Sequence, residues 1–474
     1  MCLTSGRSIR IAAASRSLPN RAFTSTSIWP KMRPVTAPID TAPPPTAGRI
    51  FRFWSPLAAT WFMMAAEGPF VAAIIARLAD PVHNLAAYGV AMAIGFVTES
   101  PIIMMLSAST ALVRDRRSYR RLRNFSFAMN VGVTALIVVV LVPPVFDGLA
   151  TGLLALPPAV ARLARDAVIM LLPWPAAIGF RRFYHGVLIS SGKTRLVAYG
   201  TVIRLATMAA TGTLLYLAGG LGGASVGTAA LSSGVVLEAI AARAWVRGDV
   251  RRLLATEPAE GAPDLSYRDI GRFYAPLAMT PLINMAANPM IAFFVGRGRM
   301  PLESLAVIPV LNSFGFIFRC SALSYQEVVI ALGRDGGRAV AALRRFATGL
   351  GGAATLLMAA VVLTPLAGLW FSDVSNLDEA LLALAIPAAL LLVPTPALSM
   401  MISWRHARLV TCRRTRIVTA GTVVEVGVIA GVLAAGIAFT GFPAVFVAVA
   451  AILAGRLSAA AFLLAFGSGD EQRS

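Results

Sequence analysis

This chain is poor in charged residues, in lysine, in histidine and in cysteine. Only 14% of its 474 residues are charged, whereas 57% are hydrophobic. A soluble protein of this length needs more charge to cover its surface. Apolar stretches of about twenty residues, the length that a bilayer core requires, recur along most of the chain. The composition therefore predicts an all-α polytopic membrane protein.

The missing residue types also exclude several kinds of active site. The three cysteines, Cys2, Cys320 and Cys412, form no CxxC pair, so they support neither a disulfide framework nor a thiolate metal site. The three histidines form no HExxH motif, and no GxSxG elbow occurs. A GKT sequence ends at Thr194, but five residues separate it from the preceding glycine, where a phosphate-binding loop has four. We expect a protein that is not an enzyme and that uses no metal or cofactor.

Acidic residues are scarce as well, since 42 basic residues face 22 acidic ones. Only two of the basic residues are lysine, and the arginines gather in alternate loops, as at 114–123, 334–345 and 405–416. This alternation is the positive-inside pattern of membrane proteins, and it does not indicate a nucleic-acid partner. It predicts that both termini are cytoplasmic.

Residues 1–50 differ from the rest of the chain. They are rich in Ser, Thr, Pro and Arg, with Asp40 as the only acid, and they contain no apolar core of a signal peptide. We expect a disordered basic tail, or a start codon placed too early with Met32 as the true start. A mitochondrial transit peptide is the alternative that this composition leaves open.

Hydropathy predicts twelve membrane spans in two groups of six. The expected organisation is a tail (1–50), an N-terminal six-helix bundle (51–246), a cytoplasmic linker (247–268), a C-terminal six-helix bundle (269–467) and a short tail (468–474). The predicted spans are 51–78, 84–113, 124–146, 164–190, 195–218, 222–245, 269–296, 302–332, 342–370, 379–404, 414–438 and 442–467.

The two groups of spans repeat one another. The sequence FWSPLA at Phe53 recurs 220 residues later as FYAPLA at Phe273, and the same shift of 220 residues places Pro69 on Pro289. Further along, the shift is 221 residues, which places His185 on His406. Because each half has six spans, the repeats are parallel and related by an axis along the membrane normal, a common ground plan of transporters.

Prolines occupy matching positions in both halves. Pro69 and Pro289 lie inside the first span of each half, where a proline frees a backbone carbonyl and kinks the helix. Pro173 with Pro175, and Pro394 with Pro396, do the same in the fourth spans. We predict that Pro69 and Pro289 are hinges.

Ionisable residues within the spans are candidates for function, because a charge at bilayer depth is costly unless it is paired or hydrated. Four ionisable residues lie in spans without being assigned to a pathway, namely Arg182, Glu238, Glu327 and Arg456. Asn284, Asn288 and Asn312 add neutral polar groups, which contact substrate or bond across helices. The residues that we predict to line a substrate or ion pathway are Glu67, Glu99, Arg181, Arg204, Asn284, Asn288, Asn312, Arg319 and Glu425.

Two opposite-charge pairs are related by the repeat. Glu99 falls on Arg319 by the first shift, and Arg204 falls on Glu425 by the second. Equivalent residues face each other across a two-fold axis if they line a central cleft, so Glu99 and Arg319 are predicted to form a gate. The alternative is that each pairs within its own bundle. Glu67, beside the Pro69 break, is suited to bind a proton or a cation.

Several segments resemble the progressive ankylosis protein family, a branch of the multidrug, oligosaccharidyl-lipid and polysaccharide exporter superfamily that includes the MATE antiporters. They are FWSPLA with Glu67 and Pro69, LAAYGVAMAI (85–94), ALVRDRR (111–117), FYAPLA, NPMIAFFVGR (288–297) and LAVIPVLNSFGF (305–316). The resemblance covers residues 51–345, and the rest is similar by topology only. It implies a V-shaped twelve-helix fold whose two bundles alternate around a central cleft. In the animal relatives it implies export of anions such as pyrophosphate, ATP or citrate.

We therefore expect a monomeric secondary transporter, an exporter of a small organic or phosphate-containing anion, coupled to protons or sodium. The short C-terminus favours a bacterial relative in the inner membrane. The alternatives are a cation-coupled multidrug exporter and a lipid-linked oligosaccharide flippase. A membrane enzyme is disfavoured because no nucleophile, base or metal set is present.

Overall fold

The computed structural model describes residues 45–257, 265–332, 337–411 and 414–467. Most of the predicted N-terminal tail, part of the predicted linker and all of the predicted C-terminal tail lie outside these residues, as do Cys2 and Cys412. In the described ranges the chain is helical, and its only extended pairing is an isolated bridge between Arg299 and Pro443.

The first half of the chain contains α1 (Ala47–Ala65), α2 (Glu67–Ala76), α3 (Pro81–Glu99), η1 (Ser100–Ile102), α4 (Met105–Leu112), α5 (Arg116–Leu141), α6 (Pro143–Asp147), η2 (Gly148–Leu153), α7 (Pro158–Met170), α8 (Trp174–Ser190), α9 (Thr194–Ala218), α10 (Gly223–Trp245) and α11 (Arg247–Ala255). The second half contains α12 (Tyr267–Met285), α13 (Ala287–Val295), α14 (Pro301–Leu332), α15 (Gly337–Leu363), α16 (Leu366–Gly368), η3 (Leu369–Val374), α17 (Glu379–Leu392), α18 (Thr395–Thr411), α19 (Thr415–Phe439) and α20 (Ala444–Gly467).

These helices confirm the predicted fold class. Within the described residues, eleven runs of helix are long and apolar enough to cross a membrane, and the pair α17 and α18 makes a twelfth that is bent by 41°. The bend lies at Pro394, where the sequence predicted a break. The fourth span is longer than predicted, because it begins at Pro158 and not at residue 164.

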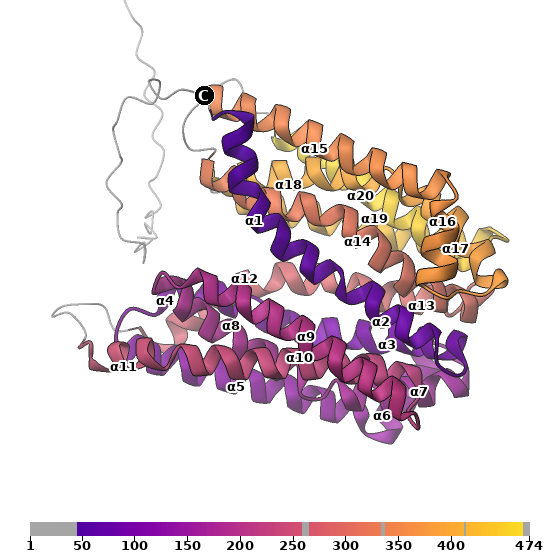
Figure 1. Cartoon of the computed structure of the whole chain (residues 1–474), viewed down its shortest axis with the longest axis horizontal. Helices are drawn as coiled ribbons and strands as arrows, with labels where there is room; N and C mark the ends of the chain where they lie inside the picture. The colour runs from indigo at the N-terminus through magenta and orange to yellow at the C-terminus, as the bar shows by residue number, and fades with distance from the viewer. Residues whose placement is uncertain (1–44, 258–264, 333–336, 412–413, 468–474) are drawn as a thin grey trace, which may run out of the picture. The chain divides into compact units, whose positions relative to one another are not determined.

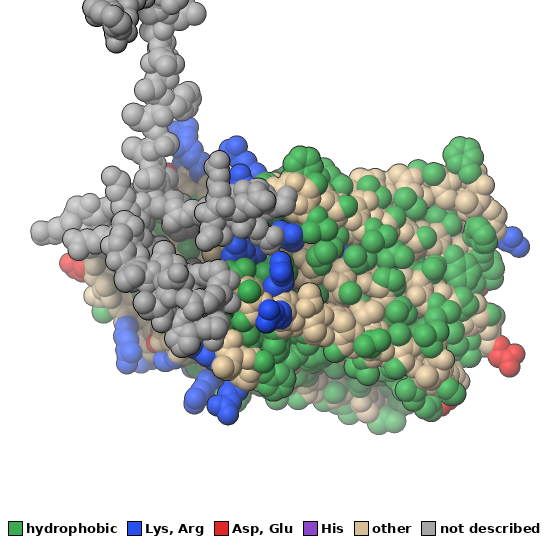
Figure 2. Space-filling model, turned by 90° about the horizontal axis from the view of Figure 1, so that it is seen from above, with side chains coloured by type: hydrophobic (Ala, Val, Ile, Leu, Met, Phe, Trp, Pro, Cys, Tyr) green, Lys and Arg blue, Asp and Glu red, His purple; other side chains and the backbone are tan. Residues whose placement is uncertain are grey.

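The outer surface is apolar, as a lipid-facing surface must be. Large hydrophobic side chains are exposed on α5, α15 and α19, with Val131 69%, Leu356 72% and Phe439 88% accessible. Figure 2 shows apolar side chains over most of one face, with arginine and lysine side chains gathered toward one end. An exposed apolar surface of this kind is unfavourable in water and favourable in a bilayer core. We refer to the end with the basic side chains as the arginine-rich end.

The first span of each half is interrupted at equivalent positions. α1 ends at Ala65 and α2 begins at Glu67, while α12 ends at Met285 and α13 begins at Ala287, so the repeat shift places one boundary on the other. Proline causes both interruptions. Pro69 and Pro289 have no N–H to donate to the carbonyl four residues earlier, so the helix is not continued normally there.

The helices before these interruptions pack on the opposite half of the chain. The Trp54 Nε1 of α1 donates to Ser324 Oγ of α14 at 2.9 Å. In the same way, the Tyr274 hydroxyl of α12 donates to the Pro101 carbonyl at 2.6 Å. Figure 1 shows α1 lying along the helices of the second half.

Aromatic contacts repeat this exchange in both copies. Trp54 packs edge-on against Phe346, and Tyr274 packs edge-on against Phe125, with ring centroids 6.4 Å and 5.4 Å apart. Trp54 and Tyr274 are repeat equivalents, and so are Phe125 and Phe346. We call these two sets of interactions the exchanged contacts. They make α1 part of the packing of the second half and α12 part of the packing of the first.

The two halves also meet where α3 crosses α14. A Cβ added at Gly89 would lie only 2.8 Å from Pro309 Cγ and 3.5 Å from the Leu305 carbonyl oxygen, so only glycine permits this approach. Gly89 and Pro309 are themselves repeat equivalents. The α3–α14 crossing therefore lies on the axis that relates the halves, eight residues into each helix and away from the arginine-rich end.

Candidate functional site

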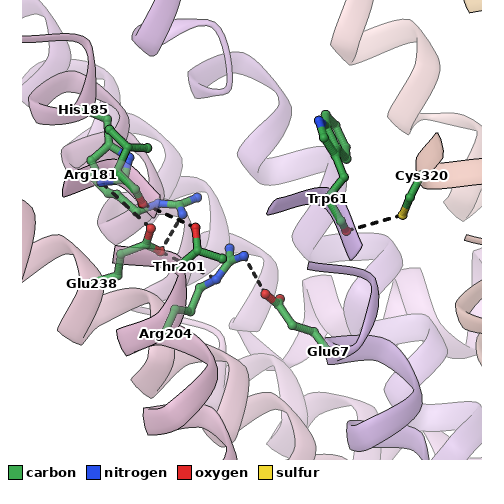
Figure 3. Close-up of polar contacts among 9 residues, drawn as sticks. Trp61, Glu67, Arg181, His185, Thr201, Arg204, Glu238 and Cys320 are labelled. Atoms are coloured by element: carbon green, nitrogen blue, oxygen red, sulfur yellow. Dashed lines mark hydrogen bonds and ion pairs between the residues drawn. The ribbon is translucent and has the colours of Figure 1, made fainter. Parts of the chain in front are cut away.

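Seven ionisable side chains come together inside the first half, and we call them the N-terminal charge cluster. They project from five helices, α2, α3, α8, α9 and α10, and Figure 3 draws most of them. The members are Glu67, Glu99, Arg181, Arg182, His185, Arg204 and Glu238.

Glu238 is the centre of this cluster. Its side chain is fully buried, and its Oε2 lies 2.5 Å from Arg181 Nη1 and 3.6 Å from Arg204 Nε. Arg204 then reaches across to α2, where its Nη2 lies 2.5 Å from Glu67 Oε1. His185 Nε2 lies 3.9 Å from the other oxygen of Glu238. The charges thus form a continuous chain that ends at the interruption between α1 and α2.

Two glycines allow this arrangement of charges. A Cβ at Gly200 on α9 would lie 3.1 Å from Glu238 Oε1, and a Cβ at Gly234 on α10 would lie 2.7 Å from the Arg204 carbonyl oxygen. Each glycine precedes a charged member by one helical turn, so α9 and α10 approach closely at that level. The close approach excludes water from Glu238 and leaves the arginines as its partners.

Every member of the cluster has a buried polar atom without a hydrogen-bond partner among the described residues, Glu99 and Arg182 included. Glu99 Oε2 and Arg182 Nε are buried without a hydrogen-bond partner among the described residues. The positive charge of Arg182 attracts the Glu99 carboxylate. The cluster as a whole has three arginines and three glutamates, so its formal charge is balanced when all are ionised. It has spare hydrogen-bonding capacity and no surplus charge.

A second group, the C-terminal charge cluster, contains Arg319 on α14, Glu425 on α19 and Arg456 on α20. Arg456 Nε lies 3.1 Å from Glu425 Oε1. Among the residues that the structure describes, Arg319 Nε donates to the Gly315 carbonyl of its own helix, at 3.3 Å.

The predicted pairing of Glu99 with Arg319 is wrong for this conformation. Each residue lies among charges of its own half, which was the alternative that the sequence left open. Repeat-equivalent residues contact each other when they lie close to the axis, as Gly89 and Pro309 do. Glu99 and Arg319 lie ten residues further on, about 15 Å along each helix. Beyond the crossing, α3 packs on α8 and α14 packs on α1.

The second repeat-related pair, Arg204 and Glu425, is also divided between the halves. Arg204 pairs with Glu67 and Glu238, and Glu425 pairs with Arg456. The structure therefore brings Glu67, Glu99, Arg181 and Arg204 together, and it places Arg319 with Glu425 in a separate cluster.

The three predicted asparagines have different surroundings. Asn284 and Asn312 are exposed, whereas Asn288 is half-buried. The Asn288 side-chain amide donates to the Met285 carbonyl at 3.3 Å, which is the carbonyl that Pro289 leaves without its usual donor. Asn288 therefore stabilises the interruption between α12 and α13. A contact of Asn284 or Asn312 with substrate stays a prediction.

Sequence reasoning did not select Glu238 as a site residue, although it recognised that Glu238 lies in a span. The available signal was charge balance. Arg181 and Arg182 need acidic partners at bilayer depth, and Glu238 is the single acid within the predicted span 222–245.

Comparison with known proteins identifies the fold. No protein-family model and no curated protein sequence matches the chain. Solved structures do match. An inward-facing multidrug resistance MATE family transporter of the MOP superfamily has a TM-score of 0.67 at 16% identity, covering 87% of this chain and 94% of that one. The lipid II flippase MurJ in an inward closed conformation has a TM-score of 0.64 at 11% identity, covering 87% and 88%.

An outward-facing MATE family transporter of the MOP superfamily also matches, with a TM-score of 0.58 at 14% identity, covering 90% of this chain and 95% of that one. These likenesses extend over nearly the whole of each chain. The progressive ankylosis family is not among them, so that resemblance stays a prediction. The chain has the fold of the MATE transporters and MurJ.

Proposed function

We propose that this protein is a secondary active exporter that works by alternating access and moves a small organic or phosphate-containing anion. The observation that carries the proposal is the pair of interrupted spans, α1–α2 and α12–α13. Each begins in the packing of one half and continues beside the other, so each joins two bodies through a proline-containing bend. Pro69 and Pro289 are the hinges in this mechanism.

The conformation fits one end state of such a cycle. The α3–α14 crossing closes the end opposite to the arginine-rich end, because Gly89 packs directly on Pro309. By the positive-inside rule the arginine-rich end is cytoplasmic, so this state is closed to the outside. The greater likeness to the inward-facing MATE structure than to the outward-facing one supports the same assignment.

The charge clusters support an anionic substrate and an ionic coupling step. Five arginines lie in the two clusters at bilayer depth, and guanidinium groups are suited to carboxylate and phosphate. Glu67 lies at the interruption between α1 and α2 and pairs with Arg204. Protonation or cation binding at Glu67 breaks this ion pair and so links the ion to movement of α2.

The test is transport by purified protein in liposomes, with pyrophosphate, ATP and citrate as substrates. Proton and sodium gradients are imposed separately, and efflux of each labelled anion is measured against protein-free liposomes. We expect at least one anion to move faster with one gradient than without it. If no gradient drives any of the three anions and a gradient does drive a cationic drug, the anion exporter is excluded and the multidrug exporter is supported.

The likeness to MurJ favours a second candidate, a flippase for a lipid-linked substrate. Fluorescent analogues of an isoprenoid diphosphate sugar in the same liposomes distinguish it. Lipid translocation without transport of soluble anions would establish the flippase.

A further inference from the structure

The two charge clusters differ in their balance of charge. In the N-terminal charge cluster three arginines face three glutamates, and Glu238 holds two of the arginines directly. In the C-terminal charge cluster, Arg319 and Arg456 face one acid, Glu425, which leaves one formal positive charge without a counter-charge.

The uncompensated charge resides on Arg319. Glu425 is engaged by Arg456 at 3.1 Å, and Arg319 forms no ion pair with any described residue. Arg456 repels Arg319, and Glu425 attracts it. All three residues lie at least ten residues from both ends of their helices, which is about 15 Å and too far for simple snorkelling to the interface.

This cluster is partly accessible. Glu425 and Arg456 keep 12% and 23% of their side chains exposed. Asn312, seven residues before Arg319 and hence on the same side of α14, is exposed. Polar groups at bilayer depth are costly in hydrocarbon, which favours contact of this asparagine and this ion pair with water.

We propose that Arg319 and Arg456 form an anion-binding site in the second half, which takes the carboxylate or phosphate group of the exported substrate. Glu425 is a positioning residue that holds the Arg456 guanidinium. The anion supplies the missing counter-charge, and the planar guanidinium groups match two oxygens of a carboxylate or phosphate. This inference rests on the proposed function and assigns its substrate site to one half.

The test is binding of citrate and of pyrophosphate to the purified full-length protein in detergent, by isothermal titration calorimetry. Arg319→Gln is the decisive variant because Arg319 forms no ion pair with a described acidic residue, so the substitution leaves no such residue without its partner. We expect the affinity of the better-bound anion to fall at least about tenfold, the effect of losing a charge-assisted hydrogen bond. Arg319→Lys keeps the positive charge but loses the planar guanidinium group. We expect its affinity for the anion to lie between those of the wild type and Arg319→Gln.

Arg344→Gln is the matched control, since it removes the same charge from an exposed position on α15. An affinity of Arg319→Gln within about twofold of the Arg344→Gln protein, for both anions, overturns the proposal. Stabilisation by phosphatidylglycerol that depends on Arg319, without binding of either soluble anion, also overturns it and assigns the site to a lipid headgroup.

The proposed binding site and the proposed exporter function can be disproved independently of each other. Arg319-dependent anion binding by a protein that drives no transport supports the site and removes the exporter. Anion transport with unchanged binding by Arg319→Gln leaves the exporter and removes the site.

Discussion

At the scale of single residues, Glu238 determines how the first half tolerates buried charge. It is the only member of the N-terminal charge cluster whose side chain is wholly inaccessible, and it lies 2.5 Å from Arg181 and 3.6 Å from Arg204. Removal of one partner from a buried ion pair is far more costly than the net contribution of the pair, because the remaining charge is desolvated and uncompensated.

We expect Glu238→Gln to lower the free energy of unfolding by about 3–5 kcal/mol. Unfolding in mixed micelles of detergent and dodecyl sulfate measures this. The double variant Glu238→Gln with Arg181→Gln removes both charges and is expected to recover part of the loss. Equal stability of wild type and Glu238→Gln would show that the ion pair does not hold the first half together.

Glu67 differs from Glu238 because Arg204 keeps a second acidic partner when Glu67 is neutralised. We therefore expect Glu67→Gln to fold normally and to lose ion-driven efflux in liposomes. Glu379→Gln, at an exposed helix start, is the control. Wild-type efflux with unchanged ion dependence in Glu67→Gln would remove Glu67 from the coupling step.

The sequence located the intramembrane charges but not their partners. Hydropathy and span limits were sufficient to single out Glu67, Arg181 and Arg204, since a charge within an apolar run is conspicuous. The repeat then suggested partners across the axis, and the structure instead pairs Arg204 with Glu67 and Glu238. The ion-pair partners of these charges depend on the distance of each helix from the axis, and the shift between the repeats does not predict that distance.

At the scale of helices, the α3–α14 crossing is a close contact between the halves. We expect Gly89→Leu to disfavour the closed state by about 1–3 kcal/mol, because even a Cβ there lies 2.8 Å from Pro309 Cγ. This shifts the ratio of closed to open states by about 5- to 150-fold. A single cysteine at the buried Ala306 of α14, labelled by a membrane-impermeant maleimide, reports the opening.

Gly132→Leu is the control for that experiment, since a Cβ added at Gly132 would have no atom within 4 Å. Labelling of Ala306→Cys should rise in the Gly89→Leu background and stay unchanged in the Gly132→Leu background. Equal labelling in both would mean that the crossing does not govern access from this end.

The exchanged contacts predict which helices move together. A bifunctional maleimide that joins Trp54→Cys to Ser324→Cys should leave transport intact, because α1 travels with the second half. A disulfide between Gly89→Cys and Pro309→Cys should abolish transport until it is reduced. Both pairs are placed in a background without the native cysteines. Inactivation by the α1–α14 link would show that α1 moves independently of the second half.

At the scale of the molecule, the twelve spans and their parallel repeat followed from hydropathy, loop charge and the nearly constant shift in numbering between the halves. The packing of α1 and α12 on opposite halves did not follow from them. In lipid, helices associate through shape and small residues, and an apolar surface gives no indication of its partner. The aromatic pairs Trp54–Phe346 and Tyr274–Phe125 were present in the repeat, but only coordinates reveal them as pairs.

The position of Gly89 and Pro309 on the axis has an evolutionary consequence. In a symmetric dimer of a single six-helix ancestor, this position faces its own copy. Two prolines there would bring one ring against the other, and two glycines would leave the crossing without a ring to fill it. A flat surface on one helix and a ring on the other require two separately mutable codons. This crossing therefore took its present form only after the gene had been duplicated, and no single-copy ancestor could have had it.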